Sequence, residues 1–343
     1  MPPRYWSRRR TFAACSSACA VPPEKILPSD NPFAARFKTL GPVAYDRDCL
    51  NHMADERERH VAHVNEIADA CAAGDSSGIA TFDAVLHDSL RTAAADVDAY
   101  ACLGANPFSK PYPTRHSVHT AMVAQMIGAK LGLDETSLQE LGLGCLIHDL
   151  GMLTVDRMAL TARKVLDDRE FVDIQKHPFY TLEMLEECVD HIPVGARMVA
   201  YQMHERADGS GYPRRRTLEQ IHPLARIAGV ADAYTALVSE RPHRHGMLPY
   251  FAMEKLLKDA SAGLFDPVAV RGLVLVLGLF PVGSYVEISP QLVGRVIRAG
   301  HADYTRPVLE VWKAGNVRSK PAIVDLGQEP KLGVTRPLTT LER

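Results

Sequence analysis

Residues 143–151 read LGCLIHDLG, an apolar run that carries a histidine and an aspartate near its end. Five apolar or small residues lead into His148 and Asp149, as in the last turns of a buried helix, and Gly151 is placed to stop that helix. A carboxylate buried without a partner is unfavourable, so Asp149 needs a cation beside it. Since His148 offers an imidazole nitrogen at the same point, a metal ion is the simplest such cation.

Further ligand-type residues follow this pair at even intervals. From Asp149 to His177 is 28 residues, from His177 to His204 is 27, and from His204 to Asp232 is 28. Each interval fits one helix and its connection, so each helix would deliver one ligand to an interior point, as in metal-binding helical bundles. With one histidine upstream, the predicted ligands are His116, His148, Asp149, His177, His204 and Asp232.

The chemistry of this set indicates both the metal and the reaction. Imidazole suits borderline metals and carboxylate suits harder ions, so four imidazoles and two carboxylates favour two divalent ions, iron or manganese. Asp149 is the candidate bridge, because each of its oxygens can ligate a different ion, and His148 with Asp149 forms the expected catalytic pair. Two ions roughly 3.5–4 Å apart lower the pKa of a shared water and clamp oxygens at phosphorus, which predicts hydrolysis of a phosphate ester.

Each of these residues also has a plainer interpretation. Taken singly, His116 or His177 is more often a packed or helix-terminal histidine than a ligand, and Asp232 suits a helix cap or a solvent-facing position. Only their conjunction favours a metal centre. Among the other ten histidines, His119 lies one turn from His116 and is a candidate to support it. The remainder, His60 among them, read as ordinary helix or surface positions.

The composition of the 343 residues limits the classes of function. A net charge of −2 leaves no basic field to hold duplex nucleic acid along an extended surface. Seven cysteines without a C-x-x-C pair argue against a disulfide framework and a zinc knuckle, and favour a reducing cytoplasm. No run approaches the roughly 18–20 apolar residues that cross a bilayer. Arginines near the N-terminus superficially resemble a secretion signal, but polar residues interrupt the stretch that follows.

Hydrophobic periodicity predicts a mainly α protein in four parts. Residues 1–31 are expected to be a disordered tail. Helical patterns at 46–72 and 79–103 make 32–112 a helical N-terminal region of unknown role. Residues 113–279, which contain the predicted ligands, are expected to be an all-α domain, with helices at 116–131, 137–149, 167–176, 181–188, 194–204, 223–238, 249–260 and 267–279. Short β-branched runs at 285–288, 293–297, 308–312 and 322–326 make 280–343 a small β-module, of barrel type, with a tail.

Residues 208–213, DGSGYP, read locally as a tight turn whose glycines can take positive φ and whose backbone N–H groups can face an anion. Alone the motif is weak, but it starts four residues after His204. At this point the sequence resembles the HD-GYP family, bacterial metal-dependent phosphodiesterases that degrade cyclic di-GMP. The resemblance covers about 113–279 and rests on RHS (115–117), HDLG (148–151), KHP (176–178), HERADGSGYP (204–213), HPLARI (222–227), ADAY (231–234) and RPHR (241–244).

The resemblance implies an all-α HD-type helical bundle with two or three metal ions, and opening of cyclic di-GMP to linear pGpG, in some members onward to GMP. It assigns the six predicted ligands to the metal centre. Gly211, Tyr212 and Pro213 of the GYP loop are expected to contact the substrate or a partner. Arg241 and Arg244 are expected to clamp phosphate oxygens through paired hydrogen bonds, although arginines that follow a helix also suit a plain surface position.

Several positions depart from the family pattern. Met152 replaces a usual lysine, so a cation able to contact phosphate or assist the leaving group is absent and slow turnover is expected. Met203 replaces the first of two histidines, and Tyr112 stands where some members have a glutamate for a third metal. Both changes favour two ions over three. Thr235 replaces a second carboxylate whose role the sequence does not assign.

The expected function is therefore hydrolysis of cyclic di-GMP by a hydroxide held at Asp149 between two ions. The main alternative is a catalytically weak cyclic di-GMP sensor, or a module that docks onto diguanylate cyclase (GGDEF) proteins through the GYP loop. Met152 and Met203 favour that alternative, whereas the intact ligand set argues against it. A hydrolase for another nucleotide is less favoured, because the GYP segment would then have no role. A homodimer is also left open.

Overall fold

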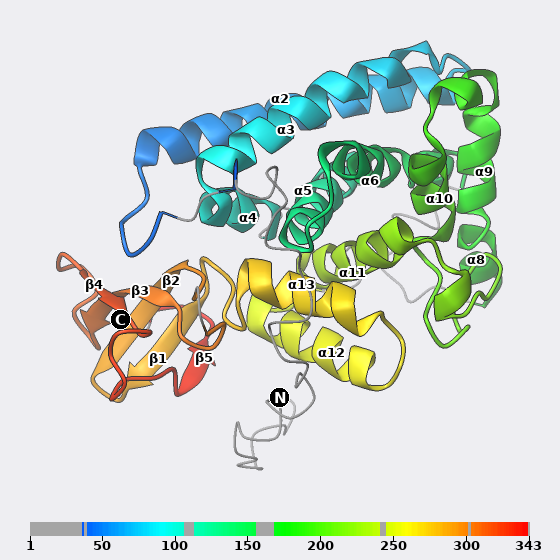
Figure 1. Cartoon of the computed structure of the whole chain (residues 1–343). Coiled ribbons are helices and arrows are strands. Elements are labelled where there is room, and N and C mark those ends of the chain that lie inside the picture. The colour runs from blue at the N-terminus through cyan, green and yellow to red at the C-terminus, as the bar shows by residue number, and fades with distance from the viewer. Residues whose placement is uncertain are drawn as a thin grey trace.

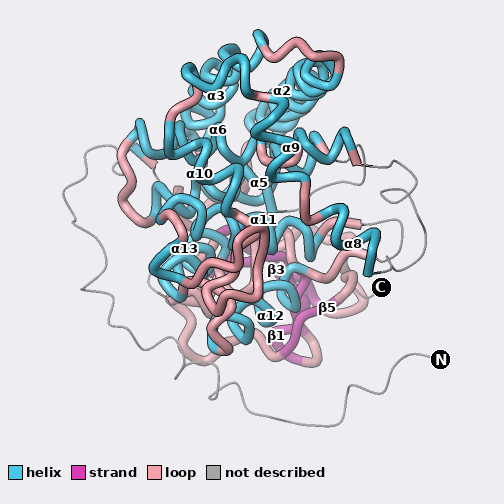
Figure 2. The backbone as a smooth tube through the Cα atoms, turned by 90° about the vertical axis from the view of Figure 1, so that its right-hand side faces the viewer, coloured by secondary structure: helices cyan, strands magenta, loops and turns pink. Residues whose placement is uncertain are grey.

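The computed structural model describes residues 36–37, 40–105, 113–155, 168–240, 245–300 and 303–341. Within these ranges the chain is mainly helical and ends in a small antiparallel sheet, which confirms the predicted fold class. In Figures 1 and 2 two long N-terminal helices lie along the top of a helical bundle, and the sheet lies on the lower side. No helix in these ranges is long and apolar enough to cross a membrane. The tail predicted at 1–31 falls outside them.

The N-terminal region consists of a long helix and a second, divided one. Asp46 caps α2 (Arg47–Ala72), since its carboxylate accepts a hydrogen bond from the N–H of Asp48 at 2.9 Å. The expectation of one helix over 79–103 is wrong, because a 3-10 turn η3 (Ser77–Thr81) is followed by two helices, α3 (Phe82–Ala95) and α4 (Val97–Ala105). The helical conformation is interrupted at Asp96, whose backbone is extended with φ −156°. The carboxylate of Asp96 accepts a hydrogen bond from the N–H of Ala99 at 3.1 Å.

The middle of the chain is a bundle built around α5 (Thr114–Lys130). Residues 116–129 of this helix are all buried, because α4, α6, α11 and α13 pack against it from several sides. The other elements of the bundle are α6 (Glu135–Ile147), η4 (Leu150–Thr154), α8 (Asp168–Ile174), α9 (His177–Met184), η5 (Glu186–His191), α10 (Val194–Gln202), η6 (Leu218–Gln220), α11 (Pro223–Val238), α12 (Pro249–Ser261) and α13 (Pro267–Leu277).

Two helices begin at earlier residues than the sequence predicts. The helix expected from Ser137 begins at Glu135, because the carboxylate of Asp134 accepts a hydrogen bond from the N–H of Ser137 at 2.8 Å and so caps α6. The helix expected over 181–188 begins at His177, with Pro178 in its first turn, where a missing N–H is tolerated. His177 therefore lies at a helix N-terminus.

The C-terminal module is a five-stranded antiparallel sheet with strand order β4-β3-β2-β1-β5. Its strands are β1 (Tyr285–Ser289), β2 (Leu292–Arg298), β3 (Val308–Lys313), β4 (Ala322–Asp325) and β5 (Arg336–Leu338). Four strands match the predicted runs, whereas β5 was not predicted, since three residues with a central proline give no alternating signal. The edge strands β4 and β5 do not pair with each other, so the described module is an open sheet and not a barrel.

Arg298 joins this sheet to the N-terminal helices. The side chain is buried, forms ion pairs with Asp96 and, at 3.6 Å, with Asp98, and places its guanidinium 4.4 Å from the ring centre of Tyr45. Its Nε donates to the carbonyl of Val43 at 3.3 Å. The helix break at Asp96 therefore allows its carboxylate to contact Arg298 of β2, 202 residues further along the chain.

Candidate metal centre

The structure brings all six predicted ligands into one buried group, which we name the histidine-aspartate cluster. Their elements are the first turn of α5 for His116, the end of α6 for His148 and Asp149, the start of α9 for His177, the turn after α10 for His204, and the middle of α11 for Asp232. The even spacing in the sequence thus corresponds to convergence from successive helices, as expected.

Two carboxylates organise the cluster. Asp149 Oδ1 lies 3.2 Å from His148 Nε2 and 3.5 Å from His177 Nε2. Asp232 Oδ1 lies 2.8 Å from His116 Nε2, and its Oδ2 lies 3.5 Å from His204 Nδ1. Each aspartate is therefore in contact with imidazoles from two different elements.

Five of the six residues form two groups with metal-ligand geometry, both groups contain Asp149, and Asp232 lies in neither. One group is His116, His148 and Asp149; the other is Asp149, His177 and His204. Within each group the ligand atoms lie within 4.8 Å of one another. The sharing of one carboxylate by two groups is the arrangement expected of a residue that bridges two ions.

The ring nitrogens of the histidines fit this interpretation. Nδ1 of His148 donates to the carbonyl of Cys145 at 2.8 Å, and Nδ1 of His177 donates to the carbonyl of Ile174 at the same distance. Backbone acceptors of this kind fix the tautomer, leaving the lone pair on Nε2. Among the described residues, the buried Nε2 atoms of His148, His177 and His204 have no hydrogen-bond partner. The donor set therefore fits divalent metal ions.

Gly151 allows α9 to lie directly on the turn that follows Asp149. Its N–H donates to the hydroxyl of Thr181 at 2.9 Å, and that hydroxyl donates to the carbonyl of His148 at 2.8 Å. A Cβ at Gly151 would lie 2.2 Å from the carbonyl oxygen of His177. The glycine of the HDLG motif thus sets how closely His177 approaches Asp149.

Gly151→Ala is accordingly expected to lower the phosphodiesterase activity predicted from the sequence by about 100-fold, because α9 must shift and a displacement of about 1 Å at a reacting centre has that effect. Metal content measured by elemental analysis should fall as well. Gly333→Ala is the matched control, since nothing lies within 4 Å of a Cβ at that glycine. Equal activity of the two variants would show that the close approach does not position His177.

The GYP loop lies against the cluster through Tyr212. Its ring stacks on the imidazole of His204, with ring centres 4.9 Å apart and 17° between the planes, and it meets the ring of His177 edge-on at 6.0 Å. Gly211 has no room for a side chain, because a Cβ would lie 2.3 Å from the backbone nitrogen of Arg206. Pro213 is partly buried behind a cis peptide bond.

Glu205 holds this loop in place and was not singled out from the sequence. Its buried carboxylate accepts hydrogen bonds from the N–H groups of Arg214 at 2.7 Å and Arg216 at 2.9 Å. The available signal was a glutamate directly after His204, at the start of the segment that leads to the GYP loop. Arg241 and Arg244 lie outside the described residues, so their expected role as a phosphate clamp stays a prediction.

The positions that depart from the family pattern are also buried where they are described. Met203 is fully buried and belongs to the apolar core, and Met152 is buried in η4. The Thr235 hydroxyl contacts that of Thr120 at 2.9 Å, which places it inside the bundle. Tyr112 lies outside the described residues.

The N-terminal helices reach the cluster at Arg115, the neighbour of His116. Its guanidinium donates to both carboxylate oxygens of Glu58 on α2, at 2.8 Å and 2.5 Å, and this pairing lowers the pKa of Glu58 to about 2. His119, proposed as a support for His116, is fully buried but makes no hydrogen bond among the described residues. The structure therefore gives it no hydrogen-bonding role toward a ligand.

Charge is unevenly distributed over the cluster. Burial acts to lower the pKa of His148, but the carboxylates of Asp149 and Asp232 overcome it and raise that pKa to about 9. Burial acts to raise the pKa of Asp149, and the neighbouring imidazoles hold it far below its usual range. His177 behaves oppositely, because burial and the ring of His204 lower its pKa to about 4. Before an ion binds, His148 therefore carries the proton.

Metal binding is consequently expected to release this proton and to strengthen with rising pH. Only a neutral imidazole ligates an ion, so the apparent affinity should fall about tenfold for each pH unit below the His148 pKa. His177 adds no proton, since it is already neutral. Titration of the chelator-treated chain with Mn²⁺ at about pH 7 and about pH 8, with proton release recorded in weak buffer, checks this. An unchanged affinity between the two would contradict the raised pKa of His148.

Comparison with known proteins agrees with this geometry. Residues 107–268 match the HD domain family. The chain is 34% identical over 227 residues to the cyclic di-GMP phosphodiesterase PA4108 of Pseudomonas aeruginosa, covering 64% of this chain and 53% of that protein. It is 31% identical over 171 residues to 3'3'-cGAMP-specific phosphodiesterase 3 of Vibrio cholerae, covering 50% of this chain and 36% of the relative.

A third relative, the cyclic di-GMP phosphodiesterase PdeB of Borreliella burgdorferi, is 24% identical over 213 residues, 62% of this chain and 55% of its own. The chain thus spans about half the length, or less, of these relatives. Among solved structures, the HDG"Y"P protein Bd1817 of Bdellovibrio bacteriovorus shares the fold, with a TM-score of 0.57 at 16% identity over 70% of this chain and 75% of that one. The fold, the cluster and the family match together show that the chain carries an HD domain over residues 107–268, and its relatives include cyclic di-GMP phosphodiesterases.

Proposed function

We propose that the chain is a metal-dependent phosphodiesterase that hydrolyses cyclic di-GMP to linear pGpG, and product analysis decides between pGpG and GMP as the end product. The observation that carries this proposal is the position of Asp149 in both groups of buried ligand atoms, since a shared carboxylate is what a pair of ions at a phosphoryl centre requires. The relatives named above, which include cyclic di-GMP phosphodiesterases, support the substrate class.

In this proposal the six residues of the histidine-aspartate cluster hold two divalent ions, iron or manganese. When bound, such ions act as Lewis acids and activate water. Asp149 and His148 form the catalytic pair: Asp149 fixes the spacing of the two groups, and the carbonyl of Cys145 holds the His148 ring in one orientation.

The GYP loop would contact the nucleotide. Gly211, Tyr212 and Pro213 lie beside His204, held there by the backbone hydrogen bonds to Glu205, and Tyr212 presents a partly exposed aromatic ring suited to stacking. Arg241 and Arg244 would clamp the phosphate oxygens. Because the cluster is buried, the loop rather than the ligands provides contacts that distinguish one cyclic dinucleotide from another.

The experiment is product analysis with the purified chain. The protein is loaded with Mn²⁺, or with Fe²⁺ without oxygen, and incubated separately with cyclic di-GMP and with 3'3'-cGAMP. Linear product is then followed by chromatography. Metal-dependent formation of pGpG supports the proposal. Faster turnover of 3'3'-cGAMP would assign the chain to the other substrate class represented among its relatives.

A cyclic di-GMP sensor is the second candidate function. Met152 and Met203 favour it, because apolar buried side chains occupy positions where the family pattern has a lysine and a histidine. Binding of cyclic di-GMP at micromolar concentration without metal-dependent product would establish the sensor. Chain variants Met152→Lys and Met203→His that gain activity would show that these two residues limit turnover.

Partners and cellular place complete the proposal. The GYP loop carries the consecutive arginines 214–216, of which Arg214 and Arg215 are exposed, and this surface is where a diguanylate cyclase (GGDEF) protein would dock.

The five cysteines in the described ranges are free thiols, which fits a reducing cytoplasm. We also retain the four-part division at 31, 112 and 279, with the catalytic domain at 113–279.

A further inference from the structure

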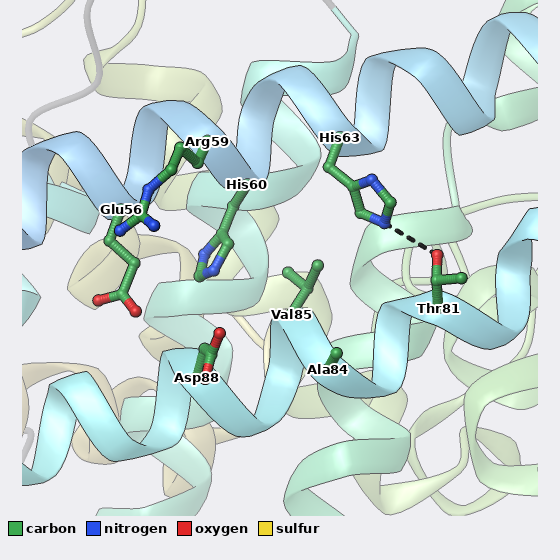
Figure 3. A pocket seen from close by; sticks show the side chains of 8 residues that line it. All are labelled: Glu56, Arg59, His60, His63, Thr81, Ala84, Val85 and Asp88. Atoms are coloured by element: carbon green, nitrogen blue, oxygen red, sulfur yellow. Dashed lines mark hydrogen bonds between the residues drawn. The ribbon is translucent and has the colours of Figure 1, made fainter.

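A second set of metal-ligand side chains lies between the two N-terminal helices, separate from the histidine-aspartate cluster. Glu56 and His60 stand four residues apart on α2 and therefore share one face of that helix. Asp88 faces them from α3. Figure 3 shows the side chains of Glu56 and His60 pointing toward α3 and that of Asp88 pointing back toward α2. One ligand atom from each residue lies within 4.8 Å of the others.

These residues line a cavity of about 400 Å³ that is open to solvent. Glu56 is only 5% exposed, and the Thr92 hydroxyl donates a hydrogen bond to its carboxylate, which fixes the orientation of that group. His60 is partly buried, and burial lowers its pKa although two carboxylates are close. No hydrogen bond within the described part of the chain occupies the His60 ring. A neutral imidazole thus faces two carboxylates without another partner.

Arg91 is a cation that would compete with a metal ion for the two carboxylates. Its guanidinium lies 2.9 Å from Asp88 Oδ1 and 3.8 Å from Glu56 Oε1. The Arg91 side chain is 74% exposed, and ion pairs at such positions contribute only about 0–1 kcal/mol to stability. An ion that is ligated by both carboxylates and the imidazole would displace it into solvent.

We propose that Glu56, His60 and Asp88 bind one divalent transition-metal ion, zinc in the first instance, with water in the position that faces the cavity. Zinc accepts histidine nitrogen and carboxylate oxygen in a four-coordinate shell, and two carboxylates balance its charge. The ion clamps α2 to α3. His60 was not predicted to be a metal ligand from the sequence, because Asp88 comes to lie opposite it only when α3 packs against α2. The site is independent of the function proposed above.

The test measures zinc binding by the full chain in which the histidine-aspartate cluster is disabled by Asp149→Ala and Asp232→Ala. After chelator treatment, zinc is titrated in competition with a chromogenic chelator. One equivalent is expected to bind, and zinc is expected to raise the unfolding temperature. His60→Ala in the same background should weaken binding at least about tenfold, since loss of even a supporting partner of a ligand has that effect.

His63→Ala is the matched control. His63 lines the same cavity three residues further along α2, but its ring contacts the Thr81 hydroxyl at 2.8 Å, so its removal should leave zinc affinity unchanged. Arg91→Ala should tighten binding, because the competing cation is gone. Absence of zinc binding in the background variant overturns the proposal, and so does a His60→Ala chain that binds as well as its parent.

A second readout avoids dependence on the background variant. The otherwise unaltered chain is reconstituted with excess zinc, freed of unbound metal, and analysed for metal per chain. His60→Ala should contain one equivalent less than the parent while His63→Ala contains the same amount. Equal metal content in all three chains would rule out the site.

Discussion

Asp149→Ala is expected to lower kcat/KM for cyclic di-GMP by at least about 10³-fold, because metal ions supply several kcal/mol of charge stabilisation in such reactions and both groups of ligand atoms contain this residue. A variant of a ligand found in only one group, such as His116→Ala or His177→Ala, leaves the other group complete. Metal content should therefore fall to near zero in Asp149→Ala and by about half in the single-group variants. Elemental analysis beside product chromatography measures both quantities.

Asp173→Ala is the control for this prediction. Asp173 is an exposed carboxylate on α8, and it pairs with Lys176 at 2.7 Å directly before His177. Its loss should leave metal content and turnover unchanged. An Asp149→Ala chain that retains full metal content would show that Asp149 is not a ligand, and one that loses metal but keeps its activity would remove the metal from the mechanism.

Arg298→Met is expected to lower the free energy of unfolding by about 3–5 kcal/mol, the range found when one partner of a buried ion pair is removed. Arg298 is 0% exposed, and without it Asp96 and Asp98 keep their charges in a buried position with no guanidinium beside them. Thermal and denaturant unfolding of the full chain measure the effect. Asp96→Asn with Asp98→Asn should restore part of the loss, since an amide oxygen still accepts the hydrogen bond from Ala99.

Arg295→Met on the same strand provides the comparison. Arg295 pairs with Glu310 at 2.6 Å, but its side chain is 44% exposed, so the loss should be about 0–1 kcal/mol. Similar destabilisation by the two substitutions would mean that Arg298 contributes no more than a surface pair does. Retention of metal content by Arg298→Met would show that the loss is confined to packing of the sheet against the N-terminal helices.

Convergence of the six ligands was predictable because each step of the inference is local. A period of 27–28 residues fits one helix and its connection, and His148 with Asp149 lies at the end of an apolar run, where a buried carboxylate demands a cation. The sharing of Asp149 between two groups followed from carboxylate chemistry. Asp149 was expected to lie between imidazoles, and the structure places it there.

Features that depend on distant partners could not be predicted in this way. The helix break at Asp96 depends on Arg298, far along the chain, and the three residues of β5 form a strand only because β1 pairs with them. Glu205 looks like any helix-end glutamate until the loop after Tyr212 folds back onto it. In each case the structure depends on a contact between residues that are distant in the sequence. The local sequence pattern therefore does not predict it.

The predicted ligands of the histidine-aspartate cluster include His116 and Asp232, which are 116 positions apart in the sequence, and come from five helices or their ends. Loss of the middle of the segment from His116 to Asp232 removes Asp149, which belongs to both groups, whereas loss of the N-terminal end removes His116 from one group only. Full metal occupancy is therefore expected only of a chain in which the whole segment has folded. Proteolysis that removes Asp149 should release both ions together, whereas proteolysis that removes only His116 should release about half of the metal.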